Sequence, residues 1–272
     1  MSALPGSSPD RPALQAAPRP GGGGVLPLWP LALLAGLLPL AGALAAWAVS
    51  TQQQLIPACN PFVDGCVSVS RAARVGLPNL IFQALMVPAA TLQGLVWLLA
   101  ARWLRAGLGP TRGVRWLAPL GVTAAVALVV YATFLGTEGA AYRFLRQYGT
   151  VVYFGFTCLC LLLAGGAVQQ LAARGALHLP VALERAMLVL AATLVALGLG
   201  NAFVGAAFGE PWKGRVENVT EWWGSLLFVL GFFALAAMWR RLGLGLTLQA
   251  AQAPAADAAA PPAQSPAPAP RR

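Results

Sequence analysis

The chain has 272 residues, of which 58% are hydrophobic and only 10% are charged, whereas soluble domains carry about 25% charged residues. Its mean hydropathy is +0.69, and a soluble fold of this length could not hide so much apolar surface from water. The composition therefore excludes an ordinary soluble domain and predicts a protein surrounded mostly by lipid.

Six apolar runs are long enough to form transmembrane helices. A bilayer core of about 30 Å needs roughly 20 apolar residues in a helix, and helices leave no backbone group unpaired in hydrocarbon. We predict an all-α polytopic bundle of six helices over residues 25–245, with disordered cytoplasmic tails at 1–24 and 246–272. A count of five or seven stays open, because the last helix has an indistinct start. The expected spans are Leu26–Val49, Leu80–Leu104, Trp116–Leu135, Val151–Ala173, Val181–Phe208 and Trp222–Trp239.

Two features of the first spans need comment. Pro39 and Pro88 fall inside them, and membrane helices tolerate such prolines when neighbours pair the freed carbonyls. Ala46-Trp47-Ala48 resembles a signal-peptide cleavage site. The apolar run before it is longer than the usual h-region of up to about 15 residues, so we favour an uncleaved helix.

The basic residues predict the orientation. With both termini in the cytoplasm, 12 of the 18 Lys and Arg residues are cytoplasmic, as the positive-inside rule requires. The basic excess is then a consequence of topology, with some attraction to anionic lipid head groups, and it requires no nucleic-acid partner. The expected location is an integral, multi-pass position in a membrane, namely the bacterial inner membrane if the source is bacterial.

The first outer loop contains Cys59 and Cys66, with Asn-Pro and Asp-Gly turn signals between them. Outside the cytosol the compartment is oxidising, so we favour a Cys59–Cys66 disulfide. The rivals are free thiols and metal binding, but for metal no histidine lies on this side and the spacing does not match a zinc site. Cys158 and Cys160 fall within the fourth span and are interpreted as small apolar residues.

Polar residues from three outer loops should meet over one end of a compact bundle. One interpretation is a polar pocket that binds a membrane lipid or a membrane-protein partner. The other is a solvated, salt-bridged cap that only makes the loops rigid. The candidate binding residues are Asp64, Ser68, Ser70, Glu138, Arg143, Asn201, Glu217, Glu221 and Trp222.

Asn201 and Glu221 are the most informative of these. Asn201 lies in the apolar fifth span, where a polar group is costly without a partner. It is either a contact between helices, helped by small neighbours such as Gly198 and Gly200, or the wall of a pocket. Asn218 and Glu221 fit a capping box at the start of the last span, which is compatible with a site role for Glu221. Trp222 suits an interfacial anchor.

Several short stretches resemble the DRAM-like membrane family, which includes damage-regulated autophagy modulators, a GPI-anchor lipid-remodelling factor and a domain of ceramide-remodelling proteins. The stretches are Ser68-Val69-Ser70-Arg71, Leu77-Pro78 with Phe82, Tyr148-Gly149 with Val152-Tyr153-Phe154, and Glu221-Trp222. The chain departs from the family at Ala73, where glycine is usual, and at Gln147 or Tyr148, where many members have histidine. The resemblance implies a six-span bundle and a connection to membrane lipids or glycolipids.

The favoured function is therefore lipid or partner binding without catalysis, with no cofactor and no metal. The only histidine, His178, lies in an expected cytoplasmic loop, so a zinc hydrolase and a histidine-assisted serine nucleophile have little support. The alternative is a lipid-remodelling enzyme at the outer leaflet that uses Asp64, Ser70 or Glu221.

Overall fold

A computed structural model describes residues 25–247, and this part of the chain contains six long helices, one short helix and two short strands. The strands β1 (Val25–Pro27) and β2 (Gly245–Thr247) pair in a two-stranded sheet. The predicted tails lie outside the described residues, except that residues 246 and 247 belong to β2. The helices are α1 (Trp29–Gln52), α2 (Val69–Ala72), α3 (Gly76–Leu108), α4 (Arg112–Phe134), α5 (Ala140–Ala173), α6 (Val181–Phe208) and α7 (Trp212–Arg241).

The prediction of an all-α, six-span membrane bundle is confirmed. Every helix except α2 is long and apolar enough to cross a membrane, so the chain is an integral, multi-pass membrane protein. The boundaries of α6 match the sequence prediction. However, α5 begins at Ala140 rather than Val151, and α7 begins at Trp212 rather than Trp222. An apolar run marks the stretch that fits the hydrocarbon, whereas the backbone hydrogen bonds continue the helix beyond it.

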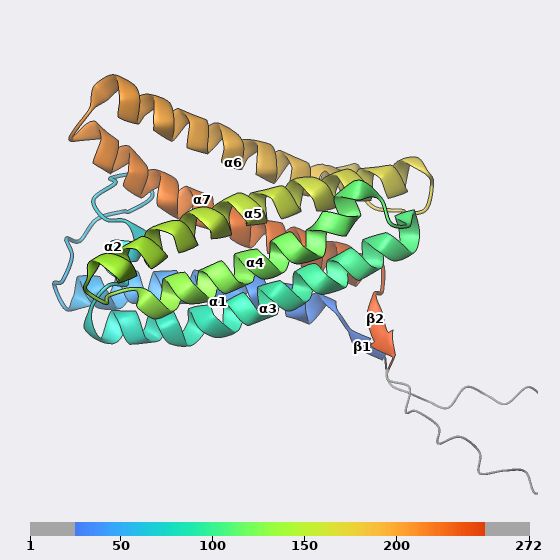
Figure 1. The fold of residues 1–272 in the computed structure, drawn as a ribbon, viewed down its shortest axis with the longest axis horizontal. Helices are drawn as coiled ribbons and strands as arrows, with labels where there is room; N and C mark the ends of the chain where they lie inside the picture. The colour runs from blue at the N-terminus through green and yellow to red at the C-terminus, as the bar shows by residue number, and fades with distance from the viewer. Residues whose placement is uncertain (1–24, 248–272) are drawn as a thin grey trace, which may run out of the picture. The chain divides into compact units, whose positions relative to one another are not determined.

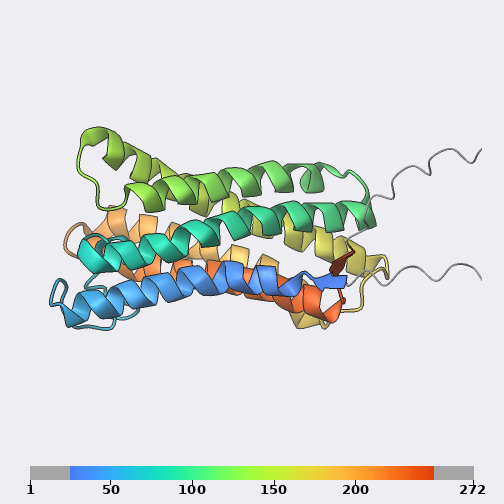
Figure 2. The same cartoon turned by 90° about the horizontal axis from the view of Figure 1, so that it is seen from below.

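Within the helical unit, Pro27–Leu244, the long helices run antiparallel and each packs against the next along the chain (Figures 1 and 2). Contacts between α1 and α7 close the bundle. The peripheral helix is α6. Only 11% of its most apolar stretch is buried inside the protein, compared with 33–56% of the corresponding stretches of the other five spans. It packs mainly against α5 and α7.

Small residues bring the core helices together. One of the two core clusters contains the buried side chains of Trp97 on α3 and Phe232 on α7, whose ring centroids lie 5.5 Å apart. A Cβ added at Gly121 on α4 would collide with the Trp97 side chain. Glycine at this position therefore allows α3 and α4 to approach closely, as small residues do in membrane bundles.

Pro39 lies inside α1, and another helix pairs the backbone carbonyl that this proline leaves free. Proline removes the backbone hydrogen bond to the residue four positions earlier, which here is Ala35. The Gln93 side chain of α3, 2% exposed, donates a 3.0 Å hydrogen bond from Nε2 to the Ala35 carbonyl oxygen. The expectation that a neighbouring helix would satisfy such a carbonyl is confirmed at this position.

Candidate functional site

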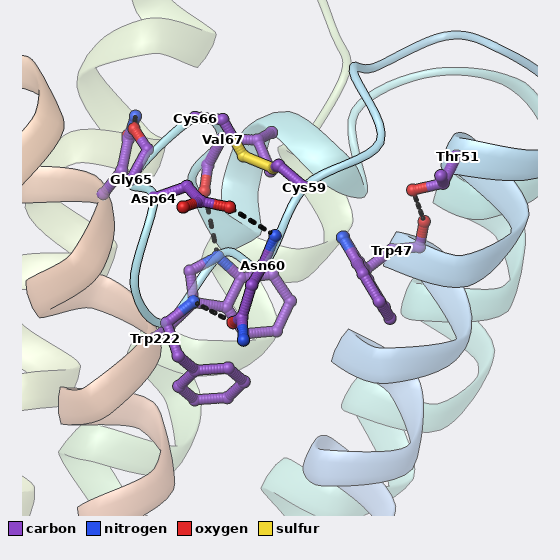
Figure 3. Close-up of a disulfide and its surroundings, with 11 residues drawn as sticks. Trp47, Thr51, Cys59, Asn60, Asp64, Gly65, Cys66, Val67 and Trp222 are labelled. Atoms are coloured by element: carbon purple, nitrogen blue, oxygen red, sulfur yellow. Dashed lines mark hydrogen bonds between the residues drawn. A yellow bond between two sulfur atoms is a disulfide. The ribbon is translucent and has the colours of Figure 1, made fainter.

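The disulfide loop, residues 53–68 between α1 and α2, is held by the predicted Cys59–Cys66 disulfide. Within it, the Asn60 amide donates to Asp64 Oδ2 at 2.8 Å, and the Phe62 amide donates to Asn60 Oδ1 at 3.1 Å (Figure 3). These are the side-chain to backbone bonds typical of tight turns. Asp64 is exposed and stabilises the loop itself rather than lining a cavity.

The N-terminal half of α7 is fixed to this loop by three side-chain donors. Each reaches a loop carbonyl that no helix or sheet could pair. Figure 3 shows Trp222 directly beneath the loop. The bonds run from Asn218 Nδ2 to Gly65 O at 2.8 Å, from Trp222 Nε1 to Val67 O at 2.9 Å and from Trp223 Nε1 to Phe62 O at 3.0 Å.

Gly65 makes this close approach possible. Its φ of +63° lies in the left-handed region, and an added Cβ would collide with the Arg215 backbone of α7. A side chain at this position would be both strained and blocked. The Asp64-Gly65 turn therefore positions the loop against α7.

A fourth contact joins α2 to α7 through Glu221. The Ser70 amide donates a 3.0 Å hydrogen bond to Glu221 Oε1, and the Ser70 hydroxyl lies 3.2 Å from the Ser68 hydroxyl. The Ser68 hydroxyl oxygen additionally accepts from the Arg71 amide and caps α2. Glu221 is half-buried, and no Lys or Arg nitrogen among residues 25–247 lies within 4.0 Å of its carboxylate. It is therefore a carboxylate held by the Ser70 amide, with no ion pair within 4.0 Å among the described residues.

The capping-box interpretation of Asn218 and Glu221 is wrong. Helix α7 starts at Trp212 with Pro211 at the N-cap position, so both residues lie inside the helix. Their own helix already pairs the amides that a capping box would serve. Both side chains turn instead to the disulfide loop and α2.

Glu221 lies at the junction of two cavities. The core cavity, of about 60 Å³, is lined by apolar side chains together with the polar residues Gln93, Tyr131, Thr150, Tyr153, Glu221 and Ser225. The α5–α6–α7 groove, of about 440 Å³, is lined by residues of those three helices, including Asn201, Glu217 and Glu221. Small-molecule sites have volumes of about 300–1,000 Å³, so the groove can hold a ligand. The core cavity has room only for a few water molecules.

Asn201 belongs to the wall of the groove. Its side chain is half-buried, and its Oδ1 atom is buried without a hydrogen-bond partner in the described part of the chain. The idea that Gly198 and Gly200 permit a close helix contact here is wrong, because a Cβ at either position would meet nothing within 4 Å. Of the two interpretations of Asn201, the geometry fits the pocket wall.

The remaining candidates divide into two groups. Glu217 lines the groove and lies 4.0 Å from Lys213 in an exposed ion pair. Glu138 and Arg143 are exposed near the start of α5 and line neither cavity. The predicted polar pocket is therefore assembled only in part: Asn201, Glu217, Glu221 and the adjacent Ser70 come together, whereas Asp64, Glu138 and Arg143 do not join them.

The sequence analysis missed four polar residues of the core cavity, namely Gln93, Tyr131, Thr150 and Ser225, and it named Tyr153 only within a family motif. All five line the cavity together with Glu221. The argument that selected Asn201, namely the cost of a polar group in a membrane helix, would have selected Gln93 as well. No cluster of three or more His, Cys, Asp or Glu residues that could hold a metal ion occurs between residues 25 and 247.

No protein-family model, curated protein or solved structure matches the chain, so its function is inferred from this site. The site combines a hydrogen-bonded carboxylate, an amide oxygen without a partner among the described residues and an apolar groove. Such a combination suits an amphipathic ligand, with its polar end at Glu221 and its apolar end along the helices.

Proposed function

We propose that this membrane protein binds a membrane lipid at the end of the bundle that carries the disulfide loop. The observation that carries the proposal is Glu221, a half-buried carboxylate beside a 440 Å³ groove with no cation of the described chain within 4.0 Å. The Ser70 amide donates to Oε1, but a half-buried negative charge is still costly without a cationic partner. A lipid head group supplies that pairing, and binding requires no bond to be broken.

The disulfide end faces away from the cytosol in this proposal. Six of the described basic residues lie at this end, and eight lie at the other, which favours the cytoplasm for the latter. A disulfide also persists in an oxidising compartment. In a bacterium, the groove would then open toward the periplasmic leaflet of the inner membrane.

Membership of the DRAM-like family is part of the proposal. Two of its motif stretches meet in space, because Ser70 of Ser68-Val69-Ser70-Arg71 contacts Glu221 of Glu221-Trp222. A third stretch supplies Tyr153 and Phe154, which line the core cavity with Glu221. Residues that carry the resemblance therefore surround one site, which supports a shared role in lipid handling.

The test is native mass spectrometry of the full chain extracted in a mild detergent. We expect the parent protein to retain a lipid, and we expect Glu221→Gln to reduce its occupancy at least tenfold, because a hydrogen bond to a charged group contributes about 1.5–3 kcal/mol. Glu138→Gln is the matched control, since Glu138 is exposed and outside both cavities. Absence of retained lipid from the parent protein would refute the proposal.

A lipid-remodelling enzyme is the second candidate, favoured by one observation. The Ser70 amide contacts the Glu221 carboxylate at 3.0 Å, so a serine nucleophile at this residue would have a proton acceptor close to it in the structure. Incubation of the purified protein with mixed lipids, followed by mass spectrometry, tests this candidate. Turnover that Ser70→Ala removes would establish the enzyme. Unchanged lipids would reject it, and lipid binding without catalysis would stand as the function.

A further inference from the structure

The α5–α6–α7 groove has room because each of the three helices contributes a glycine to it. These are Gly155, Gly198 and Gly224. A Cβ at Gly155 or Gly198 would meet nothing within 4 Å, and at Gly224 it would reach only an ordinary contact with Leu197. Gly121 and Gly165 differ, because a Cβ there would collide with a side chain of the adjoining helix. The groove glycines leave space that helix packing does not fill.

The groove extends along the apolar part of α6. It includes Leu194 and Val195 at one end and Asn201 at the other, a separation of about 10 Å at the helical rise. Val195 is 46% exposed, so the groove opens on the side of the bundle, within a span that crosses the membrane. A chain of methylene groups fits an open apolar channel of this length and keeps the rest of its length in the bilayer.

The polar end of the groove offers hydrogen-bond acceptors and negative charge. Two carboxylates line it, those of Glu217, which lies 4.0 Å from Lys213, and Glu221, and no Lys or Arg among residues 25–247 lines the groove itself. Asn201 Oδ1 is a third acceptor and has no partner among the described residues. A protonated primary amine has a positive charge and three N–H donors but no acceptor, so it complements this set of groups. A phosphate without a nearby amine would meet two like charges.

We propose that the groove holds an acyl chain of a membrane lipid whose head group carries a protonated primary amine. The amine lies against Glu221 and Asn201, and the chain follows Gly155 and Gly198 toward Leu194. This inference rests on the proposed lipid-binding function and adds to it the route of the chain and the chemistry of the head group. Unlike a polar cap that only makes the loops rigid, this binding mode requires an N–H donor on the lipid head group and an open groove for the acyl chain.

The test for the head group uses the full chain in vesicles of stated composition. Equal amounts of phosphatidylethanolamine, phosphatidylcholine and phosphatidylglycerol are offered, and the lipids that stay bound on extraction are counted by native mass spectrometry. Phosphatidylcholine keeps the positive charge but has no N–H donor, and phosphatidylglycerol has no cation. We expect phosphatidylethanolamine to exceed phosphatidylcholine about tenfold, and Glu221→Gln to remove this preference. Equal retention of all three, or preference for phosphatidylglycerol, would overturn the assignment of the head group.

The test for the groove uses two glycines of the same helix. Gly198→Phe places a ring in the groove, whereas Gly200→Phe adds the same ring at an exposed position outside it, and neither Cβ meets a neighbour. We expect Gly198→Phe to reduce lipid retention at least tenfold, and Gly200→Phe to retain the parent level. Gly155→Leu is a second blocking variant on α5, and elution as a single monodisperse species verifies folding of all three.

The outcomes separate the two proposals. If the parent retains lipid and both Phe variants retain it equally, the chain lies elsewhere and the groove assignment fails, while lipid binding stands. If the parent retains no lipid from any mixture, the proposed function fails, and this inference fails with it.

Discussion

The Ser70 amide donates a 3.0 Å hydrogen bond to Glu221 Oε1, which joins α2 to α7 across 151 positions of the chain. The same carboxylate faces the core cavity and the α5–α6–α7 groove. Glu221 therefore has two roles that substitution can separate. The hydrogen bond needs only an acceptor oxygen, whereas the attraction of a cationic ligand needs the negative charge.

Substitutions at Glu221 should affect stability and binding differently. Glu221→Gln keeps an oxygen that can accept from the Ser70 amide, so the unfolding transition should stay close to that of the parent. Glu221→Ala removes the acceptor and leaves that amide without its partner, which should lower the free energy of unfolding by about 1–3 kcal/mol. Both variants should lose lipid. Unfolding in a detergent titration measures the first effect, and equal stability of Gln and Ala variants would contradict the structural role.

The indole of Trp222 should contribute to stability through its hydrogen bond as well as its packing. Its side chain is 2% exposed and its Nε1 donates to the Val67 carbonyl at 2.9 Å. Trp222→Phe retains an aromatic ring but leaves this buried carbonyl unpaired, which should cost about 1–3 kcal/mol. Trp116→Phe is the control, because Trp116 is 59% exposed, and it should change stability by less than about 0.5 kcal/mol. Similar unfolding of the two variants would show that the loop contact is dispensable.

Sequence patterns were sufficient to predict the helical bundle but not to predict how the site is assembled. Hydrocarbon thickness sets the length of an apolar run, so the bounds of α6 could be predicted. The early starts of α5 and α7 could not, because polar residues outside the hydrocarbon continue a helix without an apolar signal. This difference placed Arg143 and Glu217 in expected loops, although both lie on helices.

The site itself depends on contacts between distant segments. The sequence marks Asn201 and Glu221 as unusual, but it does not indicate that α6 leaves a groove beside α7 or that Ser70 lies next to Glu221. The partner of Gln93 could not be predicted from the sequence either. Its partner is the carbonyl that Pro39 frees on a different helix, and only the packing of α1 against α3 brings the two together.

The link between Gln93 and Pro39 predicts a measurable coupling. Gln93→Leu leaves the Ala35 carbonyl unpaired inside the bundle, which should lower the free energy of unfolding by about 1–3 kcal/mol. Pro39→Ala restores the backbone amide that can bond to Ala35 within α1. In the Pro39→Ala background, Gln93→Leu should therefore cost less, and a double-mutant cycle should report a coupling of about 0.5–3 kcal/mol. Strict additivity of the two substitutions would show that the Ala35 carbonyl does not connect them.

The direction of the bundle in the membrane can be tested with single cysteines. In a background of Cys59→Ser and Cys66→Ser, Asp64→Cys places a thiol on the exposed disulfide loop, and Arg174→Cys places one at the exposed opposite end of α5. Cys158 is half-buried and Cys160 is buried in the bundle, so a reagent that does not cross membranes should label them poorly; the background protein alone supplies the baseline.

In intact cells, we expect this reagent to label Asp64→Cys and to label Arg174→Cys only after the membrane is opened. The physical reason is the distribution of basic residues, which favours the cytoplasm for the Arg174 end. Labelling of Arg174→Cys alone in intact cells would place the disulfide loop in the cytosol. The groove would then face the inner leaflet, and the oxidising compartment that favours the Cys59–Cys66 bond would be missing.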